Sequence, residues 1–303
     1  MSEIRIAGHE LAGGMQNAGG GSDIFFMPFV KMHGCGNDYI FFDLFSAKMR
    51  DPEETARVLT DRNTGIGGDG IVLICPSDIA DAKIRVFNRD GSIAEMCGNA
   101  IRCVGKYLYE TGKTTKTEIN IETLSGVKEL ELIFEAGNIS AVRVNMGKAV
   151  TSAEEIPVRL YGDSIIGREV FIGGLPFEIT CVSMGNPHAV IFHEDIDLFD
   201  LAAVGPRIEH ASLFPERVNL EVAEMMSRNH IKMRVWERGT GETLSCGTGA
   251  CAAVVAAVLM GYCDKGTDIR VTLRGGSLTV NYTDEAVYLT GEAVKIFEGM
   301  VEV

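Results

Sequence analysis

Two cysteines, Cys97 and Cys246, stand where a thiol can take part in chemistry. Cys246 closes the stretch that starts at Glu237, and an apolar run from Ala250 to Met260, ended by Gly261, follows it. Such a run predicts a buried helix with a glycine cap. A cysteine at a helix entrance faces backbone N–H groups without intrahelical partners and the positive end of the helix dipole, and both favour thiolate over thiol. The pattern therefore predicts a reactive thiol.

The surroundings of Cys97 repeat those of Cys246. Equivalent residues are separated by a constant 149 positions (246 − 97 = 149). The matching pairs are Asn37 and Asn186, Arg85 and Arg234, Val86 and Val235, Phe87 and Trp236, Arg89 and Arg238, Cys97 and Cys246, Gly98 and Gly247, and Gly112 and Gly261. So many matches in one register indicate an internal duplication. The two cysteines are then symmetry mates, one in each domain, on either side of a cleft.

Opposed thiols of this kind predict proton transfer at a carbon atom. A thiolate on one face of a small molecule removes a hydrogen, a thiol on the other face delivers one, and the carbon is inverted. A free thiol has a pKa of about 8.5, and a lowered value allows one charged and one neutral thiol near neutral pH. The helix starts also offer N–H groups to a carboxylate and to a developing enolate, without a pyridoxal cofactor. These groups belong to Gly98, Asn99, Gly247 and Thr248.

The segments around the two predicted helices alternate in the manner of strands. We expect strands at 39–44, 70–75, 83–87, 118–123, 128–134 and 141–144, and in the second copy at 179–184, 189–192, 218–223, 231–236, 268–273, 277–281 and 286–289, with shorter helices at 52–60 and 201–210. A helix that is apolar on all sides must be enclosed, and the strands are the available wall. The sequence therefore predicts an α+β fold of two pseudo-symmetric domains, each a β-barrel-like sheet wrapped around a central helix.

The duplication divides the chain into three parts. We assign residues 28–142 together with 290–303 to the first domain and residues 143–289 to the second. Residues 1–27 have no counterpart in the second copy and are rich in glycine, so we interpret them as a loosely ordered extension. A chain of 303 residues is long enough for two separate cores.

Composition limits the partners and the compartment. The formal net charge of −14 argues against nucleic acid or an anionic membrane surface as the main partner. The longest apolar run, Ala250 to Met260, is too short to span a bilayer. The eight cysteines have no CxxC spacing, which argues against a metal site, and the absence of a secretory signal favours reduced thiols in the cytoplasm. We interpret Cys103 and Cys251, inside the predicted helices, as core residues.

Six motifs carry a resemblance to a known family. They are Lys31 to Asp38, Asp61 to Gly70, Asn88 to Ser92, Met96 to Ala100, Met184 to His188, and Glu237 to Gly239 together with Cys246 to Gly249. In these motifs the chain resembles the diaminopimelate epimerases, which are cofactor-independent amino-acid epimerases, and the resemblance extends from Phe29 to the C-terminus. It implies epimerisation of LL-2,6-diaminopimelate to the meso form, in the synthesis of lysine and peptidoglycan precursors, by a homodimer.

The resemblance also implies roles for individual residues. Cys97 and Cys246 correspond to the acid/base pair, and Gly98, Asn99, Gly247 and Thr248 to the carboxylate cradle. Substrate contacts correspond to Asn37, Asn88, Asn186, Asn219, Glu237 and Arg238. Some members of the family carry glutamine where this chain has Gly70, so a side-chain contact at that position does not carry over.

Other interpretations stay open. The chain can instead be a racemase of the histidine or proline type, and outside enzymes the thiols can serve in redox sensing. The asparagines can be turn residues that satisfy backbone groups, and Glu237 and Arg238 can form a surface ion pair. His188 can orient a catalytic cysteine or stabilise a turn. Measuring hydrogen exchange at a substrate α-carbon without added cofactor separates these classes.

Overall fold

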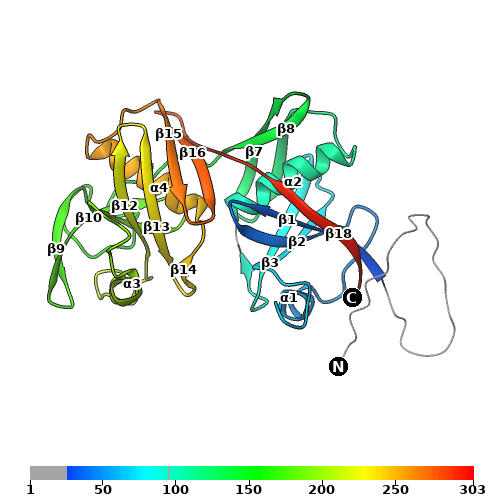
Figure 1. The fold of residues 1–303 in the computed structure, drawn as a ribbon, viewed down its shortest axis with the longest axis horizontal. Coiled ribbons are helices and arrows are strands. Elements are labelled where there is room, and N and C mark those ends of the chain that lie inside the picture. Colours follow the sequence, from blue (N-terminus) through cyan, green and yellow to red (C-terminus); the bar gives the residue numbers. More distant parts are fainter. Residues whose placement is uncertain (1–25, 95) are drawn as a thin grey trace.

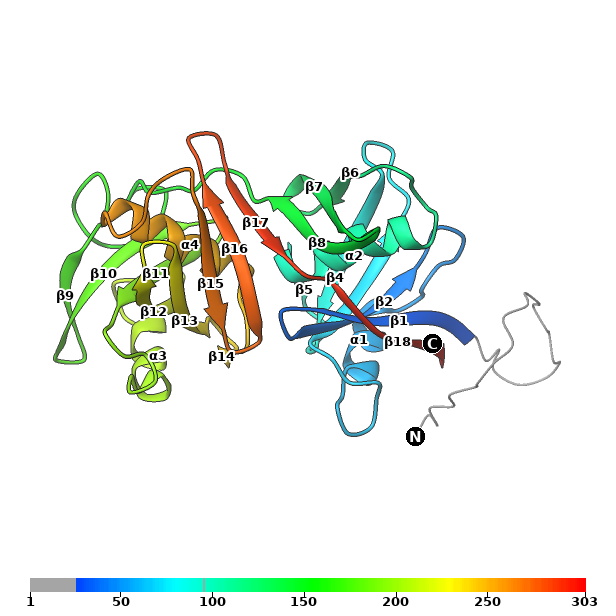
Figure 2. The same cartoon turned by 45° about the horizontal axis from the view of Figure 1, so that its top comes forward.

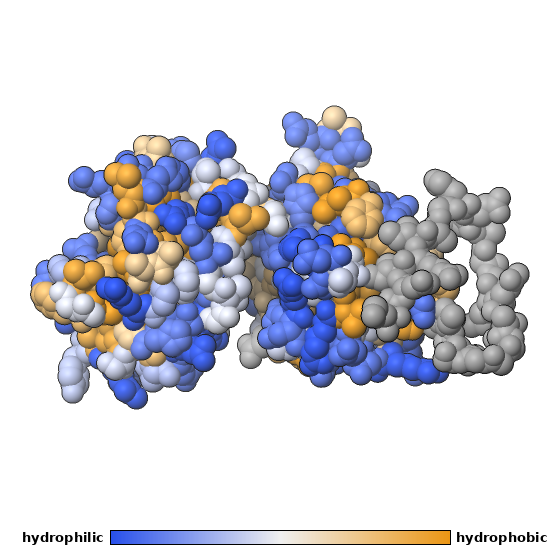
Figure 3. All heavy atoms as spheres, turned by 60° about the horizontal axis from the view of Figure 1, so that its bottom comes forward, coloured by the Kyte–Doolittle hydropathy of each residue, from blue (hydrophilic) through white to orange (hydrophobic). Residues whose placement is uncertain are grey.

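The computed structural model describes residues 26–94 and 96–303, which form two lobes side by side (Figure 1). A space-filling view shows the lobes meeting at a narrow waist (Figure 3). Most of the expected N-terminal extension, residues 1–25, lies outside the described residues. Phe26 and Met27, however, already belong to the first strand, and Met27 is buried. The first described strand thus begins two residues before Pro28, where we start the first domain.

The second copy repeats the order of helices and strands of the first, after one additional strand. The helices are α1 (Pro52–Leu59), α2 (Gly98–Glu110), α3 (Leu201–Glu209) and α4 (Gly247–Leu259). The strands of the first copy are β1 (Phe26–Gly34), β2 (Asn37–Asp43), β3 (Gly70–Cys75), β4 (Ala82–Asn88), β5 (Ile93–Ala94), β6 (Glu118–Thr123), β7 (Gly126–Glu135) and β8 (Asn138–Asn145). Those that follow are β9 (Arg168–Ile172), β10 (Leu175–Ser183), β11 (Pro187–Phe192), β12 (Asn219–Ser227), β13 (His230–Glu237), β14 (Gly241–Thr243), β15 (Asp268–Leu273), β16 (Gly276–Tyr282), β17 (Val287–Gly291) and β18 (Val294–Glu302).

Strand pairing reproduces the duplication. The first lobe pairs its strands in the order β18, β1, β2, β3, β4, β6, β7 and β8, and the second in the order β9, β10, β11, β12, β13, β15, β16 and β17. Parallel pairs fall at the same two places in each order, β2 with β3 and β4 with β6, and β11 with β12 and β13 with β15. The duplicated α+β architecture predicted from the sequence is confirmed.

The sheet of each lobe curls around one central helix. Helix α4 packs against strands from β10 through β17, and its residues from Gly249 to Ala257 are all buried. This helix has no polar side to turn toward water, so enclosure is the stable arrangement. Helix α2 packs in the same way against β1, β2, β7 and β8, although its buried surface includes a charged residue, Arg102. Within the described residues, no helix is long and apolar enough to cross a membrane.

The two lobes are joined through their last strands. β8 pairs antiparallel with β17, for example Val144 opposite Leu289, and the chain then returns to the first lobe, where β18 lies along β1 (Figure 2). The domain boundaries that we assign after residues 142 and 289 both fall inside these paired strands. The return of β18 agrees with placing residues 290–303 in the first domain, and the division itself remains a proposal.

Candidate active site

Cys97 and Cys246 hold the same local geometry at the starts of the two central helices. Each is the N-cap residue, with backbone angles of φ −133° and ψ 112° for Cys97 and φ −128° and ψ 116° for Cys246. Each sulfur accepts a hydrogen bond from a backbone N–H of the first turn, at 3.4 Å from Ala100 N and 3.4 Å from Gly249 N. The extended cap conformation turns the side chain back over the open end of the helix.

The starts of the two helices lie against each other. A Cβ atom added to Gly247 would lie 3.7 Å from the Cα atom of Gly98, and one added to either glycine would meet the same Leu289 side chain. Asn99, the second residue of α2, donates its amide to the Ser245 hydroxyl at 3.2 Å. The structure thus brings together the four predicted cradle residues. Their first-turn N–H groups have no partner within their own helices.

Asn37 and Tyr39 border the Cys97 sulfur. Cys97 Sγ donates to Asn37 Oδ1 at 3.4 Å, and the Asn99 amide donates to the same oxygen at 3.3 Å. Burial raises the pKa of the Cys97 thiol, while the Tyr39 hydroxyl and the backbone N–H groups of Ala100 and Asn99 oppose that shift. The Tyr39 pKa is itself raised well above its ordinary value, chiefly by burial.

Carboxylates border the Cys246 sulfur. Burial raises the pKa of this thiol well above its ordinary value, and the negative charges of Glu237 and Glu221 raise it further. Thr248 Oγ1 lies 3.4 Å from the sulfur and favours the thiolate, but more weakly. We expected the helix entrances to lower both thiol pKa values. That expectation is wrong, because desolvation of each sulfur outweighs the dipole and the N–H bonds.

Glu237 acts electrostatically on both thiols. Its charge raises the pKa of Cys97 as well as that of Cys246. Burial also raises the pKa of Glu237 itself, against a hydrogen bond from the Thr243 hydroxyl. The neighbouring Arg238 points elsewhere, with its guanidinium donating to Glu216 O at 3.1 Å. Glu237 and Arg238 therefore do not form the surface ion pair that the sequence left open.

Asn186 contacts the start of α4 with one end of its side-chain amide and His188 with the other. Asn186 Nδ2 donates to Thr248 Oγ1 at 3.4 Å, and Asn186 Oδ1 lies 3.0 Å from His188 Nε2. On its other side, His188 Nδ1 lies 2.8 Å from Glu221 Oε1, and both side chains are fully buried. The hydrogen bonds of His188 therefore go to Asn186 and Glu221, and not to the Cys246 sulfur.

The remaining predicted contacts, Asn219 and Asn88, lie at strand ends. Asn219 begins β12, and its Oδ1 accepts from Arg238 N at 2.9 Å while its Nδ2 donates to Pro187 O at 3.4 Å. Asn88 ends β4 and donates to Ser92 Oγ at 3.0 Å. The side chains of Asn219 and Asn88 thus also satisfy neighbouring polar groups, as turn residues do. Gly70 pairs with Asn88 across β3 and β4, and a Cβ there would collide with the Phe87 carbonyl oxygen.

Arg102 is a functional neighbour that the sequence did not suggest. Its guanidinium is fully buried and donates to Gly98 O and Asn99 Oδ1, both at 2.9 Å, and to Glu292 O at 3.3 Å. Gly291 and Gly34 leave the room for it, since a Cβ at either would press on the guanidinium. A single positive charge therefore ties the start of α2 to the segment that returns from the second lobe.

All eight cysteines are free thiols. Cys103 and Cys251 are buried core residues, as predicted, and burial raises the pKa of each to about 12. Among the residues that the structure describes, no three His, Cys, Asp or Glu side chains are grouped so as to hold a metal ion.

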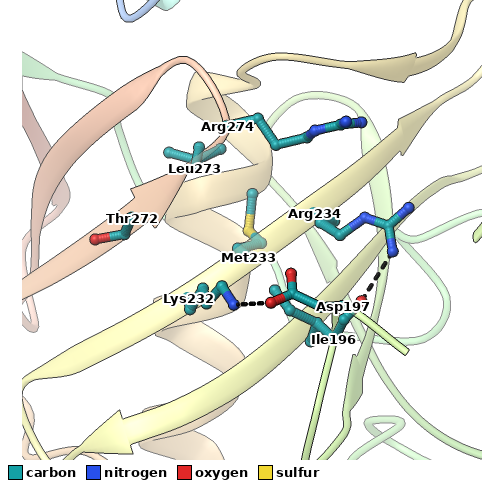
Figure 4. A pocket seen from close by; sticks show the side chains of 8 residues that line it. All are labelled: Ile196, Asp197, Lys232, Met233, Arg234, Thr272, Leu273 and Arg274. Atoms are coloured by element: carbon teal, nitrogen blue, oxygen red, sulfur yellow. Dashed lines mark hydrogen bonds and ion pairs between the residues drawn. The ribbon is translucent and has the colours of Figure 1, made fainter. Parts of the chain in front are cut away.

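A pocket of about 280 Å³ lies away from this junction, on the second lobe (Figure 4). It is lined by Ile196, Asp197, Lys232, Met233, Arg234, Thr272, Leu273 and Arg274. Its charged groups already have partners, because Lys232 pairs with Asp197 and Arg234 with Glu242. None of the predicted site residues lines it.

A sequence model of the family described as diaminopimelate epimerase matches residues 29–152 and 180–296. The chain belongs to the diaminopimelate epimerase family. It is 50% identical over 279 residues to a diaminopimelate epimerase of Methanococcus maripaludis, covering 91% of this chain and 100% of that one. It is 51% identical to one from Acetivibrio thermocellus, with 91% and 99% covered, and 52% identical to one from Desulfovibrio desulfuricans, with 90% and 97% covered.

Solved structures with the same fold extend beyond the diaminopimelate epimerase family. A probable proline racemase from Agrobacterium radiobacter matches with a TM-score of 0.70 at 16% identity, with 91% of this chain and 92% of that one covered. A PhzF-family phenazine biosynthesis protein from Bacillus anthracis matches with a TM-score of 0.66 at 17% identity, with 92% and 100% covered. At such low identity these likenesses establish the fold alone.

Proposed function

We propose that this protein catalyses the epimerisation of LL-2,6-diaminopimelate to meso-diaminopimelate. The observation that carries the proposal is the pair of cysteines, Cys97 and Cys246, in matching cap geometry at two helix starts that lie against each other. Membership of the diaminopimelate epimerase family and relatives of that name at about half identity support the choice of substrate. The protein is then an isomerase of amino-acid biosynthesis, in the supply of lysine and peptidoglycan precursors.

The proposed chemistry uses two bases and no pyridoxal cofactor. One cysteine, as thiolate, removes the α-hydrogen, and the other, as thiol, delivers its hydrogen to the opposite face of the same carbon. Burial raises the pKa of both thiols. Removal of the α-hydrogen therefore depends on the groups that favour a thiolate, among them the first-turn N–H groups beside each sulfur. The first-turn N–H groups of Gly98, Asn99, Gly247 and Thr248 then stabilise the substrate carboxylate and the enolate charge that develops on it.

The far end of the substrate carries a second ammonium and a second carboxylate, and the junction offers groups of suitable charge. Glu237 supplies a partly buried carboxylate for an ammonium. Arg238 supplies an exposed guanidinium for a carboxylate, and its planar shape suits two parallel hydrogen bonds. We assign Asn37, Asn88, Asn186 and Asn219 as further substrate contacts. A specific recognition of both ends is what favours diaminopimelate over a histidine- or proline-type substrate.

We further propose a cytoplasmic homodimer. Strand β18 pairs with β1 along one edge and exposes Ile296 and Phe297, which are 49% and 43% exposed. Two large apolar side chains on a strand at the edge of a sheet favour pairing with a second copy. Light scattering of the purified chain tests this assignment, and a monomer mass would refute it. A reducing cytoplasm suits an enzyme that needs two free thiols.

The two-base mechanism is tested by isotope incorporation in deuterated water. A thiol holds one proton, so the cysteine that delivers hydrogen supplies it from solvent, while the one that removed a hydrogen still holds the substrate's own. Starting from the LL-substrate, early meso product should carry deuterium at the inverted carbon, and recovered LL-substrate should carry almost none. Equal labelling of both pools would point to a single polyprotic base and would refute the proposal.

Single variants assign the two roles. Cys97→Ala and Cys246→Ala should each abolish epimerisation, because one face of the substrate then lacks its acid or base, while the remaining thiol can still exchange hydrogen on its own face. Cys103→Ala, which removes a core thiol from the same helix, is the matched control and should remain active. A near-parental rate in either single active-site variant would exclude that cysteine from catalysis.

A further inference from the structure

The buried Glu221 neither transfers a proton nor contacts the substrate in the proposed chemistry, and its surroundings call for an explanation. Its side chain is fully buried in β12, one carboxyl oxygen contacts His188, and the other, Oε2, has no hydrogen-bond partner. A buried oxygen without a partner destabilises a fold, and a hydrophobic residue of similar size would avoid that cost. In the first copy the equivalent position, 149 residues earlier, is occupied by Val72, which is also fully buried.

The replacement of valine by glutamate is matched by a second difference between the copies. A Cβ atom at Gly249 would lie 2.6 Å from Glu221 Oε1, so the carboxylate fits only because position 249 has no side chain. The first copy, which carries the smaller Val72, has Ala100 at the position equivalent to Gly249. The helix start beside Cys246 is therefore built to accommodate the carboxylate.

The hydrogen bonds of His188 show what the carboxylate does. The amide oxygen of Asn186 has no proton to donate, so its 3.0 Å contact with His188 requires a proton on Nε2. The 2.8 Å contact between Nδ1 and Glu221 Oε1 requires a second proton, because otherwise two lone pairs would face each other. With Glu221 present, the pair holds both protons. Without Glu221, a neutral His188 carries one proton, which can lie on either ring nitrogen. With that proton on Nδ1, Nε2 would accept from the Asn186 amide nitrogen, and the Asn186 amide would be turned the other way round.

The equivalent asparagine in the first copy is held the opposite way round. Asn37 Nδ2 donates to Asp69 Oδ2 at 2.7 Å, which leaves Oδ1 toward Cys97. In Asn186 it is Oδ1 that is held, by His188, which leaves Nδ2 toward Thr248. One copy thus presents a hydrogen-bond acceptor beside its thiol, and the other presents a donor beside the start of its helix.

We propose that Glu221 is a positioning residue that, through His188, holds the Asn186 amide as a donor for a substrate carboxylate at the start of α4. The two asparagines related by the duplication would then distinguish the ammonium from the carboxylate of an amino acid and fix the direction in which it enters a nearly symmetric site. This inference rests on the proposed function, since it requires an amino-acid substrate at the junction.

The test compares two substitutions of Glu221 in the full-length protein. Glu221→Val, which copies the first lobe, should raise the KM for diaminopimelate by about 10-fold or more, with a smaller effect on kcat. Glu221→Gln keeps the shape and can donate from its amide to His188 Nδ1, so that Nε2 still carries a proton, and it should recover most of the lost affinity. Val222→Ala, on the same strand but on its opposite face, controls for loss of packing and should change thermal stability without changing KM.

A double-mutant cycle with Asn186→Ala supplies the decisive result. If Glu221 acts through Asn186, adding Glu221→Val to Asn186→Ala should cause little further rise in KM. Multiplicative losses in the folded double variant would overturn the inference, as would a loss in Glu221→Gln as large as in Glu221→Val. If the parent protein does not exchange the α-hydrogen of diaminopimelate, the proposed function itself fails, and that failure is visible before any variant is made.

Discussion

Asn99 donates a hydrogen bond across the lobes to Ser245, with 3.2 Å between Nδ2 and Oγ. Asn99 is the second residue of α2, and Ser245 is the residue immediately before Cys246. The bond therefore connects the backbone that carries one thiol to the backbone that carries the other. Arg102 strengthens the connection, because its guanidinium holds the Asn99 oxygen at 2.9 Å and so leaves the amide nitrogen free to donate.

Loss of this bond should impair the chemical step. Ser245→Ala removes the acceptor, and small displacements of two groups that must act on one carbon are costly for the rate. We expect kcat to fall by about 10-fold, with little change in thermal stability. Ser277→Ala, at a surface serine that accepts from Arg270, is the control and should leave kcat unchanged. An unaltered kcat in Ser245→Ala would mean that the thiols are aligned without this bond.

Glu237→Gln should make both thiols more reactive toward alkylation even if catalysis is lost. The Glu237 charge raises the pKa of Cys97 and of Cys246, so a neutral side chain lowers both and increases the thiolate fraction at a given pH. Alkylation by iodoacetamide, located by mass spectrometry, should be several-fold faster in the variant at neutral pH. In the parent, the rate should still climb with pH above the value at which an ordinary cysteine is fully ionised, because both thiol pKa values are raised. Glu242→Gln, whose carboxylate pairs with Arg234, should alkylate at the parental rate.

Arg102→Met should destabilise the protein strongly. The substitution leaves Gly98 O, Asn99 Oδ1 and Glu292 O without their shared donor in a buried place. We expect the free energy of unfolding in urea to fall by about 3 kcal/mol. Arg102→Lys keeps the charge but makes fewer hydrogen bonds, so its free energy of unfolding should lie between those of Arg102→Met and the parent. A loss below about 1 kcal/mol for Arg102→Met would show that water or rearrangement satisfies the three acceptors.

Arg238→Lys tests recognition of the far end of the substrate. Lysine keeps the charge but loses the two parallel donors of the guanidinium, so turnover of diaminopimelate should weaken by about 10-fold or more. The comparison that decides the assignment is the parent protein with an amino acid that lacks the second carboxylate. If the parent turns that substrate over equally well, Arg238 does not bind a distal carboxylate.

The sequence predicted the elements that have a local signature and missed those that depend on distant partners. Strands β3, β6 and β15 lie where expected, because their alternating or apolar runs are bounded by turn residues. Strand β1 was not predicted, since it contains Pro28 and a buried Lys31, whose ammonium pairs with Asp38 in a different strand. No local pattern announces that a lysine will be buried by an ion pair.

The residues of the candidate site also fall into those that the sequence reveals and those that only the structure reveals. The cysteines and the cradle glycines were found because they recur at a fixed offset in the chain. Glu221 escaped notice because a single glutamate between Leu220 and Val222 has no partner visible in the sequence. Tyr39 could have been found, because it stands 149 positions before His188. The direction of the thiol pKa shifts was beyond prediction, since it depends on how completely the folded protein removes water from each sulfur.

Strand β18 gives the protein an unusual order of assembly during synthesis. The other strands of the first lobe are made before the second lobe, but β1 finds the partner along its outer edge only in residues 294–302, which follow the second lobe in the sequence. The nascent first lobe must therefore wait on the ribosome with an open sheet edge while the second lobe is made. A product released before Val294 keeps that edge exposed and is prone to pair with other chains. Closing the outer edge of the first lobe therefore requires residues that are made after the second lobe.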